Sequence, residues 1–180
     1  MSLSYPGRSF VMNAHYIIVL GVSGSGKSTI AAQLAQKLDA EFIEGDLLHP
    51  ESNVEKMSSG QPLTDEDRVP WLAKIIDTAY LSKSEYCVIA CSALKKKYRD
   101  QLRDGLPGLL SISLEGDREL LQVRMNQRIG HFMPASLLDS QLGTFEAPID
   151  EQNTYRFSIS ASPIAILESA LEKINRSFAA

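Results

Sequence analysis

A short glycine-rich stretch carries the clearest chemistry in this sequence. Residues 20–30 read LGVSGSGKSTI, and Gly21 to Ser28 fit the spacing GxxxxGKS. Glycines there let backbone N–H groups surround the phosphates of a nucleotide. The lysine neutralises negative charge between the last two phosphates, and the serine hydroxyl binds Mg2+. We therefore expect a nucleoside triphosphate and Mg2+, with Lys27 catalytic and Ser28 as the metal ligand. The phosphate-binding residues would be Gly21, Val22, Ser23, Gly24, Ser25, Gly26, Lys27, Ser28 and Thr29.

Two carboxylates follow the next apolar run, in the stretch EGDLLHP. Glu44 and Asp46 flank a glycine, so one can help to hold Mg2+ through water while the other faces an acceptor hydroxyl. Transfer of a phosphoryl group to a hydroxyl needs a base within hydrogen-bond reach of that hydroxyl. We assign this role to Asp46, with an ordinary polar turn as the alternative. His49 is a weaker candidate, since a lone histidine is more often structural.

Basic residues at two further places are candidates for contact with an anion. Arg124 and Arg128 are four residues apart in a predicted helix, so they share one face, next to a glycine-interrupted stretch that can swing. An arginine delivered to the transferring phosphoryl group stabilises the transition state. In SALKKKYRD, Lys95 is the lysine nearest the end of the preceding apolar run. For all of these, the alternative is a solvated helix surface.

A regular alternation of strand and helix patterns positions these candidates. Apolar β-rich runs predict strands at 16–20, 40–46, 86–91, 109–114 and 155–160. Helical spacing predicts helices at 27–38, 52–58, 65–82, 94–103, 118–128 and from Pro163 onward, with a short helical piece within 129–148. Ser52 with Glu55 is a capping-box pattern, and Asp117 is a predicted N-cap. This alternation is typical of a parallel sheet with helices on both faces, whose ligands gather at the carboxyl ends of the strands.

Composition limits the remaining possibilities. The chain has 180 residues, with 44 % hydrophobic and 22 % charged residues, which fits one globular domain. A net charge of -4 gives no electrostatic reason to expect nucleic acid or an anionic membrane as a partner. Cys87 and Cys91 are expected to be buried free thiols, and no run is long enough to span a membrane, so a cytoplasmic location is expected. Residues 1–14 are expected to form a flexible arm, and 15–180 a single domain.

Four stretches, taken in order, are more specific than the phosphate loop alone. They read LGVSGSGKST, EGDLLHPESNVEKMSSGQPLTDEDRVPWL, CSALKKKYRDQLR and RIGHF. From about residue 16 to about residue 146 the chain thereby resembles the gluconokinases of the small P-loop type. The resemblance implies a three-layer α/β P-loop fold like that of shikimate and nucleoside monophosphate kinases, with a mobile lid at about 124–146. It also implies ATP as donor, the 6-hydroxyl of D-gluconate as acceptor, and a homodimer.

The resemblance carries over to individual residues. It supports Asp46 as the acceptor-side carboxylate and Arg124 and Arg128 as arginines of the lid. Fold analogy places the adenine near Pro163. Glu44 stands where many relatives of this fold have aspartate, which puts a metal-associated role for that position in doubt. The residues implied around the sugar-acid pocket are His49, Lys56, Arg68, Ser92 and Lys95.

The carboxylate of gluconate calls for a cation at one end of that pocket. A guanidinium pairs with a carboxylate through two hydrogen bonds, which a lysine cannot do, so we assign Arg68 to it. A salt bridge from Arg68 to Asp65 or Asp67 is an equal rival to this assignment.

Three other functions compete with gluconate phosphorylation. The first is another small-molecule kinase of the same fold, acting on shikimate or a nucleotide. The second is a nucleotide-dependent switch, but the sequence has neither the NKxD nor the DxxG segment of a GTPase. The third is an inactive protein that retains ATP affinity, and the intact Lys27, Ser28 and Asp46 argue against it.

Overall fold

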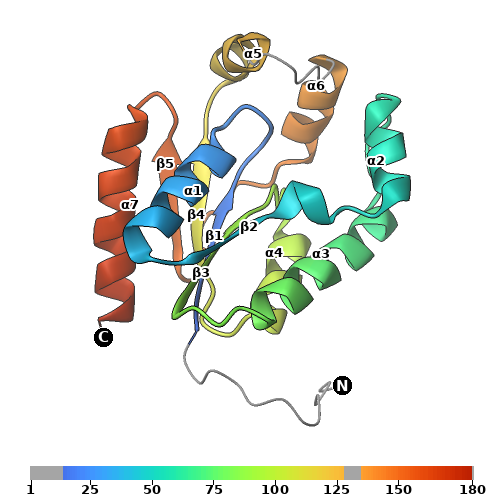
Figure 1. Cartoon of the computed structure of the whole chain (residues 1–180). Helices are drawn as coiled ribbons and strands as arrows, with labels where there is room; N and C mark the ends of the chain where they lie inside the picture. Colours follow the sequence, from blue (N-terminus) through green and yellow to red (C-terminus); the bar gives the residue numbers. More distant parts are fainter. Residues whose placement is uncertain (1–13, 128–134, 180) are drawn as a thin grey trace.

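A five-stranded parallel sheet forms the centre of the molecule (Figure 1). The computed structural model describes residues 14–127 and 135–179. The sheet has the strand order β2-β3-β1-β4-β5. Its strands are β1 (His15–Leu20), β2 (Glu41–Glu44), β3 (Tyr86–Ala90), β4 (Leu110–Glu115) and β5 (Thr154–Ser158). The predicted α/β class with five parallel strands is therefore confirmed.

Helices connect these strands and cover both faces of the sheet. They are α1 (Lys27–Leu38), η1 (Gly45–Leu48, a 3-10 helix), α2 (Glu51–Ser58), α3 (Asp65–Tyr80), α4 (Lys96–Gly105), α5 (Arg118–Asn126), α6 (Ala135–Thr144) and α7 (Pro163–Phe178). In Figure 1, α1 and α7 lie on one side of the strands and α3 and α4 on the other. The three predicted layers are thus present.

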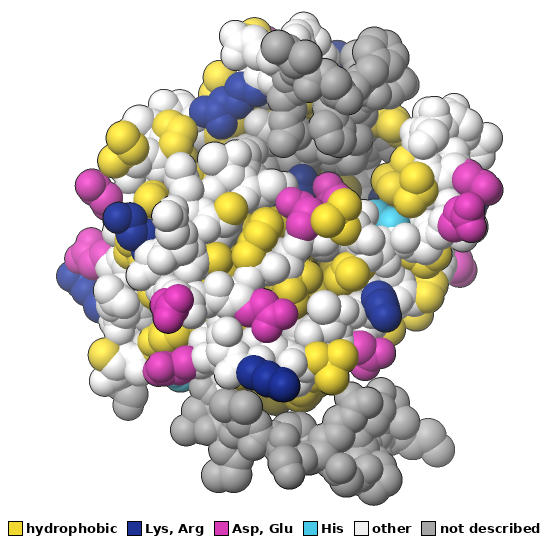
Figure 2. Space-filling view, in the orientation of Figure 1, with side chains coloured by type: hydrophobic (Ala, Val, Ile, Leu, Met, Phe, Trp, Pro, Cys, Tyr) yellow, Lys and Arg dark blue, Asp and Glu magenta, His cyan; other side chains and the backbone are white. Residues whose placement is uncertain are grey.

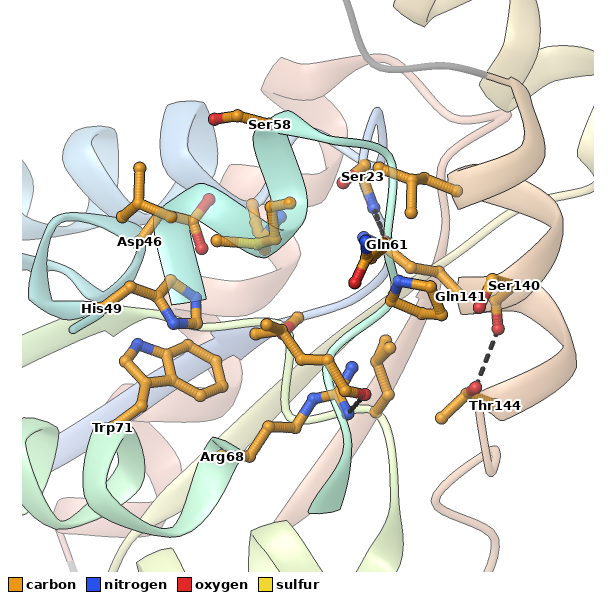
Figure 3. A pocket seen from close by; sticks show the side chains of 18 residues that line it. Ser23, Asp46, His49, Ser58, Gln61, Arg68, Trp71, Ser140, Gln141 and Thr144 are labelled. Atoms are coloured by element: carbon orange, nitrogen blue, oxygen red, sulfur yellow. Dashed lines mark hydrogen bonds between the residues drawn. The ribbon is translucent and has the colours of Figure 1, made fainter. Parts of the chain in front are cut away.

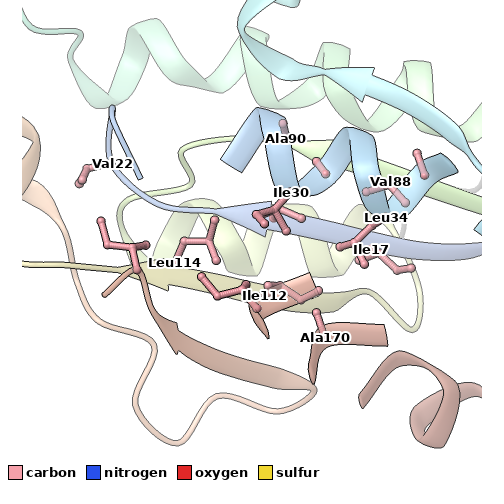
Figure 4. Packing of buried hydrophobic residues seen from close by; sticks show 14 of the residues in the cluster. Ile17, Val22, Ile30, Leu34, Val88, Ala90, Ile112, Leu114 and Ala170 are labelled. Atoms are coloured by element: carbon pink, nitrogen blue, oxygen red, sulfur yellow. The ribbon is translucent and has the colours of Figure 1, made fainter. Parts of the chain in front are cut away.

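The central strand β1 contributes side chains to two separate cores. Ile17 and Val19 belong to the cluster that packs against α1 and α7, whereas Ile18 and Leu20 face the cluster with α3 and α4. Figure 4 shows the first cluster, in which Ile17 and Ile112 of the sheet meet helix side chains. Because a parallel sheet is covered on both faces, its strands are apolar on both sides rather than alternating. This explains why β1 and β3 are continuous apolar runs.

The N-terminus of α2 differs from the sequence prediction. The predicted capping box of Ser52 and Glu55 is wrong, because α2 begins at Glu51 after Pro50, and no side chain bonds the cap. Ser52 therefore lies inside the helix, where its hydroxyl cannot cap the first turn. The capping box is found instead at α3, where Asp67 N–H donates to Thr64 Oγ1 and Thr64 N–H donates to the Asp67 carboxylate.

Candidate active site

The glycine-rich loop joins β1 to α1 and leaves the start of α1 open. Gly26 occupies the N-cap position with a φ of 91°, and no side chain caps the helix. The first N–H groups of a helix have no partner within the helix, so they are available to an anion. Gly24 has a φ of 82°, and a Cβ there would lie 2.8 Å from Met125 Cγ. Both glycines are therefore required by the positive φ angles of the loop, and Gly24 is also required by the α5 residues packed against it.

Lys27 is the first residue of α1 and points into the interior. Only 7 % of it is exposed, and it lines a cavity of about 310 Å3. Ser28 and Thr29 follow in the first turn of the helix. Two oxygens near this region are buried without a hydrogen-bond partner among the described residues, Ser25 Oγ and Glu44 Oε1.

The donor set fits Mg2+ that is bound mainly by a nucleotide. Among the described residues, no three His, Cys, Asp or Glu side chains are grouped closely enough to hold a metal ion by themselves. Mg2+ commonly uses one or two protein oxygens together with substrate phosphates and water. The Ser28 hydroxyl at the start of α1, with the buried Glu44 oxygen at the end of β2, suits such a partial coordination shell.

The cavity lies between the phosphate loop and the helices that follow β2. Figure 2 shows the surface hollowed on the side where α2 faces α6. Its apolar walls include Val54, Met57, Pro62, Leu63, Trp71, Leu94 and Leu137. Its polar lining residues are Ser23, Lys27, Asp46, His49, Ser58, Gln61, Arg68, Ser92, Ser140, Gln141 and Thr144. Four of the predicted substrate or catalytic residues outside the phosphate loop therefore share one cavity: Asp46, His49, Arg68 and Ser92.

Asp46 is positioned by the 3-10 turn that ends β2. The turn is fixed by Trp71, whose Nε1–H donates to the Gly45 carbonyl at 2.8 Å. A Cβ on Gly45 would lie 2.5 Å from the Ala90 carbonyl oxygen, so this position has no room for a side chain. The Asp46 carboxylate consequently projects into the cavity beside His49 (Figure 3).

His49 is held in one orientation and is neutral at physiological pH. Its ring stacks on Trp71 with 4.1 Å between the ring centroids, and Asn53 Nδ2 lies 3.3 Å from its Nδ1. The pKa of His49 is lowered from 6.5 to about 4. Burial is the main cause, and the positive charge of Arg68 acts in the same direction, whereas the negative charge of Asp46 opposes both. The ring can therefore form hydrogen bonds in the cavity without adding a charge to it.

Arg68 reaches the cavity from the first turns of α3. Its Nη1 donates to the carbonyls of Leu63 and Thr64, and its guanidinium lies 5.4 Å from the centre of the Tyr98 ring. The rival salt bridges to Asp65 or Asp67 are not among the described ion pairs, because lysines occupy both carboxylates.

Lys56 and Lys95 lie outside the cavity lining and are engaged in ion pairs. Lys56 Nζ is 2.8 Å from Asp67, and Lys95 Nζ is 2.8 Å from Asp65. Asp65 also accepts hydrogen bonds from Lys97 and Tyr98, and its bonds to Lys95, Lys97 and Tyr98 hold its pKa well below the usual range. The structure does not bring either lysine together with Asp46.

The arginine of α5 lies against the phosphate loop. A Cβ on Gly26 would be 3.8 Å from Arg124 Nη1, and Arg124 Nη2 donates to the Ile159 carbonyl at 2.7 Å. Arg128 lies outside the described residues. Pro163 is the first residue of α7, in the segment that follows β5 and Ile159.

Three residues of the site have no sequence signal of their own. Trp71 and Asn53 fix the turn and the histidine, and Gln141 of α6 accepts a hydrogen bond from the Ser23 N–H of the phosphate loop at 2.8 Å. Trp71 and Gln141 act through contacts with residues distant in sequence, whereas Asn53 contacts His49, four residues before it. Helical spacing indicates which face of α3 is buried but not which backbone atom Trp71 bonds.

Among residues 14–127 and 135–179, no helix has both the length and the apolar character needed to cross a membrane.

Comparison with known proteins relates this site to one family. Residues 17–148 match a family described as an AAA domain. The thermosensitive gluconokinase of Escherichia coli is 45 % identical over 166 residues, which cover 91 % of this chain and 89 % of the relative. The gluconokinase of Gluconobacter oxydans is 47 % identical, with 89 % and 91 % covered. This chain belongs to the gluconokinase family.

Solved structures agree with this family assignment. A gluconokinase from Sinorhizobium meliloti superposes with a TM-score of 0.83 at 47 % identity, covering 90 % of this chain and 92 % of that one. The APS kinase of Mycobacterium tuberculosis, at 17 % identity and a TM-score of 0.67, shares the fold. Because the chain belongs to a kinase family, the protein is an enzyme. The comparisons give no support to the two alternatives of a nucleotide-dependent switch and an inactive protein that retains ATP affinity.

Proposed function

We propose that this protein transfers the γ-phosphoryl group of ATP to the 6-hydroxyl of D-gluconate, giving 6-phospho-D-gluconate. One observation carries the proposal. Lys27 of the phosphate loop and Asp46 of the acceptor side line the same cavity, so donor and acceptor can meet there. The cavity of about 310 Å3 is at the lower end of the range for small-molecule sites, as a linear six-carbon acid requires.

The loop residues bind and orient the triphosphate. The open N-terminus of α1 supplies backbone N–H groups, and Lys27 contributes a positive charge between the terminal phosphates. Ser28 would hold Mg2+, with the buried Glu44 oxygen available to a water of its shell. When bound, Mg2+ neutralises charge that develops on the phosphate oxygens.

Asp46 accepts the proton of the attacking hydroxyl. The 3-10 turn holds its carboxylate in the cavity next to neutral His49, which can form a hydrogen bond with an acceptor hydroxyl. Arg68 binds the carboxylate at the other end of gluconate, because a guanidinium offers two parallel N–H donors. Ser92 lines the same cavity and can contact the middle of the polyol.

The remaining site residues have more distant roles in this proposal. Arg124, 3.8 Å from the Cβ position of Gly26, reaches the transferring phosphate, and Arg128 acts with it from the lid at about 124–146. Lys56 and Lys95 would contact gluconate only if their ion pairs with Asp67 and Asp65 open. Adenine would bind near Pro163.

We also propose a wider setting for this activity. It includes a homodimer, a cytoplasmic location and a single domain over 15–180, preceded by an arm at 1–14 of which residues 1–13 lie outside the described residues. The buried free thiols of Cys87 and Cys91 support a reducing compartment; burial raises both pKa values to about 12.

Measuring ADP release with ATP, Mg2+ and a panel of acceptors tests the function. D-gluconate should support turnover, and shikimate, glucose, a nucleoside monophosphate or no acceptor should not. Turnover with shikimate or a nucleotide would favour the related kinase instead, and equal ADP release without an acceptor would favour an ATPase.

A further inference from the structure

His49 has two ring nitrogens, and its neighbours determine which of them carries the proton. Its Nδ1 lies 3.3 Å from Nδ2 of Asn53, which is four residues later, on α2. An amide nitrogen can only donate, so a hydrogen bond between these two atoms makes Nδ1 the acceptor. The ring is neutral, because burial lowers the pKa of His49 to about 4. Its single N–H proton is therefore on Nε2.

A second contact fixes the orientation of the Asn53 amide. Its Nδ2 also donates to the backbone carbonyl of Asp67, in the first turn of α3, at 2.9 Å. If the oxygen and nitrogen of the amide were exchanged, two acceptors would face each other at this distance. Only 2 % of Asn53 is exposed, so little water can reach the amide to compensate for a lost bond. The protein thus favours one amide orientation, and with it one tautomer of His49.

The nitrogen on the other side of the His49 ring is accessible. Among the described residues, Nε2 has no hydrogen-bond partner, and it is also absent from the buried side-chain atoms that lack one. The ring lines the cavity, and Trp71 of α3 stacks on its face with 14° between the two ring planes. Asn53 and Trp71 therefore hold the ring from two directions, which leaves the Nε2–H available to a molecule in the cavity.

We infer that Asn53 is a positioning residue that fixes His49 as the Nε2–H tautomer, so that the ring donates to the oxygen of the attacking hydroxyl. That oxygen uses one lone pair for this bond and the other to attack the γ-phosphorus. Its own proton is then left for the Asp46 carboxylate, which lies beside the ring (Figure 3). As the new P–O bond forms and the bond to ADP breaks, this proton passes to Asp46.

The opposite tautomer would be harmful to the reaction. With the proton on Nδ1, Nε2 would accept the hydroxyl proton and would compete with Asp46 for it. Phosphoryl transfer depends mainly on positioning and charge stabilisation, so a misdirected hydroxyl should slow it. The inference rests on the proposed gluconate kinase function and adds Asn53 to the residues that serve it.

Exchanging the amide donor for an acceptor tests this role. Asn53→Asp keeps the shape of the side chain but replaces the NH2 group with a carboxylate oxygen, which favours a proton on Nδ1. Asn53→Leu removes both bonds without adding a charge. Asn175→Leu, the same change at an exposed position on α7, is the matched control. Thermal unfolding is measured for all variants.

NMR of 15N-labelled protein identifies which ring nitrogen is protonated, and the signal that is lost in His49→Gln belongs to His49. The kcat and both KM values are measured at a pH at which the spectrum shows a neutral ring. The wild type and Asn175→Leu should contain only the Nε2–H tautomer. Asn53→Leu should contain both tautomers, and Asn53→Asp mainly the Nδ1–H form.

We expect kcat with gluconate to follow the tautomer. It should fall about threefold in Asn53→Leu and about tenfold or more in Asn53→Asp, while the KM for ATP changes less than about threefold. Asn175→Leu should match the wild type in every measurement. A residue with a purely structural role would lower the unfolding temperature without linking kcat to the position of the proton.

Several results would overturn the inference while leaving the function intact. A proton on Nδ1 in the wild type, or a mixture of tautomers there, would do so without any variant. Wild-type kcat in Asn53→Asp would remove the link to catalysis, and a rise in both KM values at unchanged kcat would mean that the added charge only repels anionic substrates. If the wild type forms no phosphogluconate but keeps the Nε2–H tautomer, the proposed function and the alignment of the hydroxyl fail, whereas the effect of Asn53 on His49 stands.

Discussion

Arg99 and Glu151 form an ion pair that is almost completely enclosed. Arg99 Nη2 is 2.6 Å from Glu151 Oε1, and the side chains are 2 % and 5 % exposed. Arg99 also donates to the carbonyls of Ala93, Leu94 and Glu146. One guanidinium thus joins the segment that follows α6 to the loop after β3, which lines the cavity through Ser92 and Leu94.

Removal of one partner should destabilise the fold strongly. Burial alone would raise the pKa of Glu151, but its bonds to Arg99 and Arg103 lower it overall, so the carboxylate is charged. Arg99→Met leaves this buried charge with Arg103 alone. We expect a loss of about 3–5 kcal/mol in the free energy of unfolding, measured with urea.

The exposed pair of Arg176 and Glu172, at 69 % and 58 % exposure, provides the control. Arg176→Met should cost less than about 1 kcal/mol. Equal losses in the two variants would contradict a special role for the buried pair.

Asp46→Asn should separate nucleotide binding from catalysis. The amide cannot accept the proton of the attacking hydroxyl, so kcat should fall at least about 100-fold, whereas the KM for ATP should stay near the wild-type value. Steady-state kinetics measure both. Asp77→Asn, on the exposed side of α3, is the matched control and should be fully active. Near-normal turnover of Asp46→Asn would remove it from the mechanism.

Arg68→Lys should affect gluconate selectively. A lysine keeps the charge but offers no pair of parallel donors, so we expect the KM for gluconate to rise about tenfold or more and the KM for ATP to change little. Equal increases in the two values would argue against contact with the carboxylate. Lys56→Met and Lys95→Met provide the comparison. If either variant raised the KM for gluconate more than Arg68→Lys does, that lysine would be the residue that binds the carboxylate.

His49 should make stability depend on pH in a defined window. Its pKa is about 4 in the folded protein and 6.5 ordinarily, so between these values the unfolded chain binds the proton more tightly. The stabilisation is fully present above about pH 6.5 and is lost as the pH falls toward 4. From pH 7 to 4.5, the wild type should lose about 1–2 kcal/mol more than His49→Gln, allowing for a partly exposed ring. Parallel losses would contradict the burial of a neutral ring.

Most of the fold was predictable because its elements are signalled locally. The apolar run at 16–20 became β1, and Asp117 accepts from Leu120 N–H as the predicted cap of α5. The pattern at Ser52 was misleading, because a capping box describes which residues can cap, whereas Pro50 and the preceding turn decide where α2 begins. Thr64 and Asp67 form a capping box at the start of the next helix, α3.

The site residues that could be predicted are those that follow the carboxyl ends of neighbouring parallel strands, because these ends lie at the same edge of the sheet. Asp46 and Ser92 follow β2 and β3, adjacent strands of one parallel sheet, and both line the cavity. Their catalytic and binding roles remain predictions. The positive charges of Lys56 and Lys95 were not enough to predict whether they line the cavity, because the two lysines form ion pairs with Asp67 and Asp65 instead. Gln141 was missed because its contact with Ser23 is purely tertiary.

Identification of the product is the most direct test of the central claim. The protein is incubated with ATP, Mg2+ and D-gluconate, and the new phosphate ester is examined by phosphorus NMR with proton coupling. Transfer to the 6-hydroxyl predicts an ester phosphorus coupled to the two protons of the terminal CH2 group. Coupling to a single methine proton, or the appearance of inorganic phosphate alone, would contradict the account.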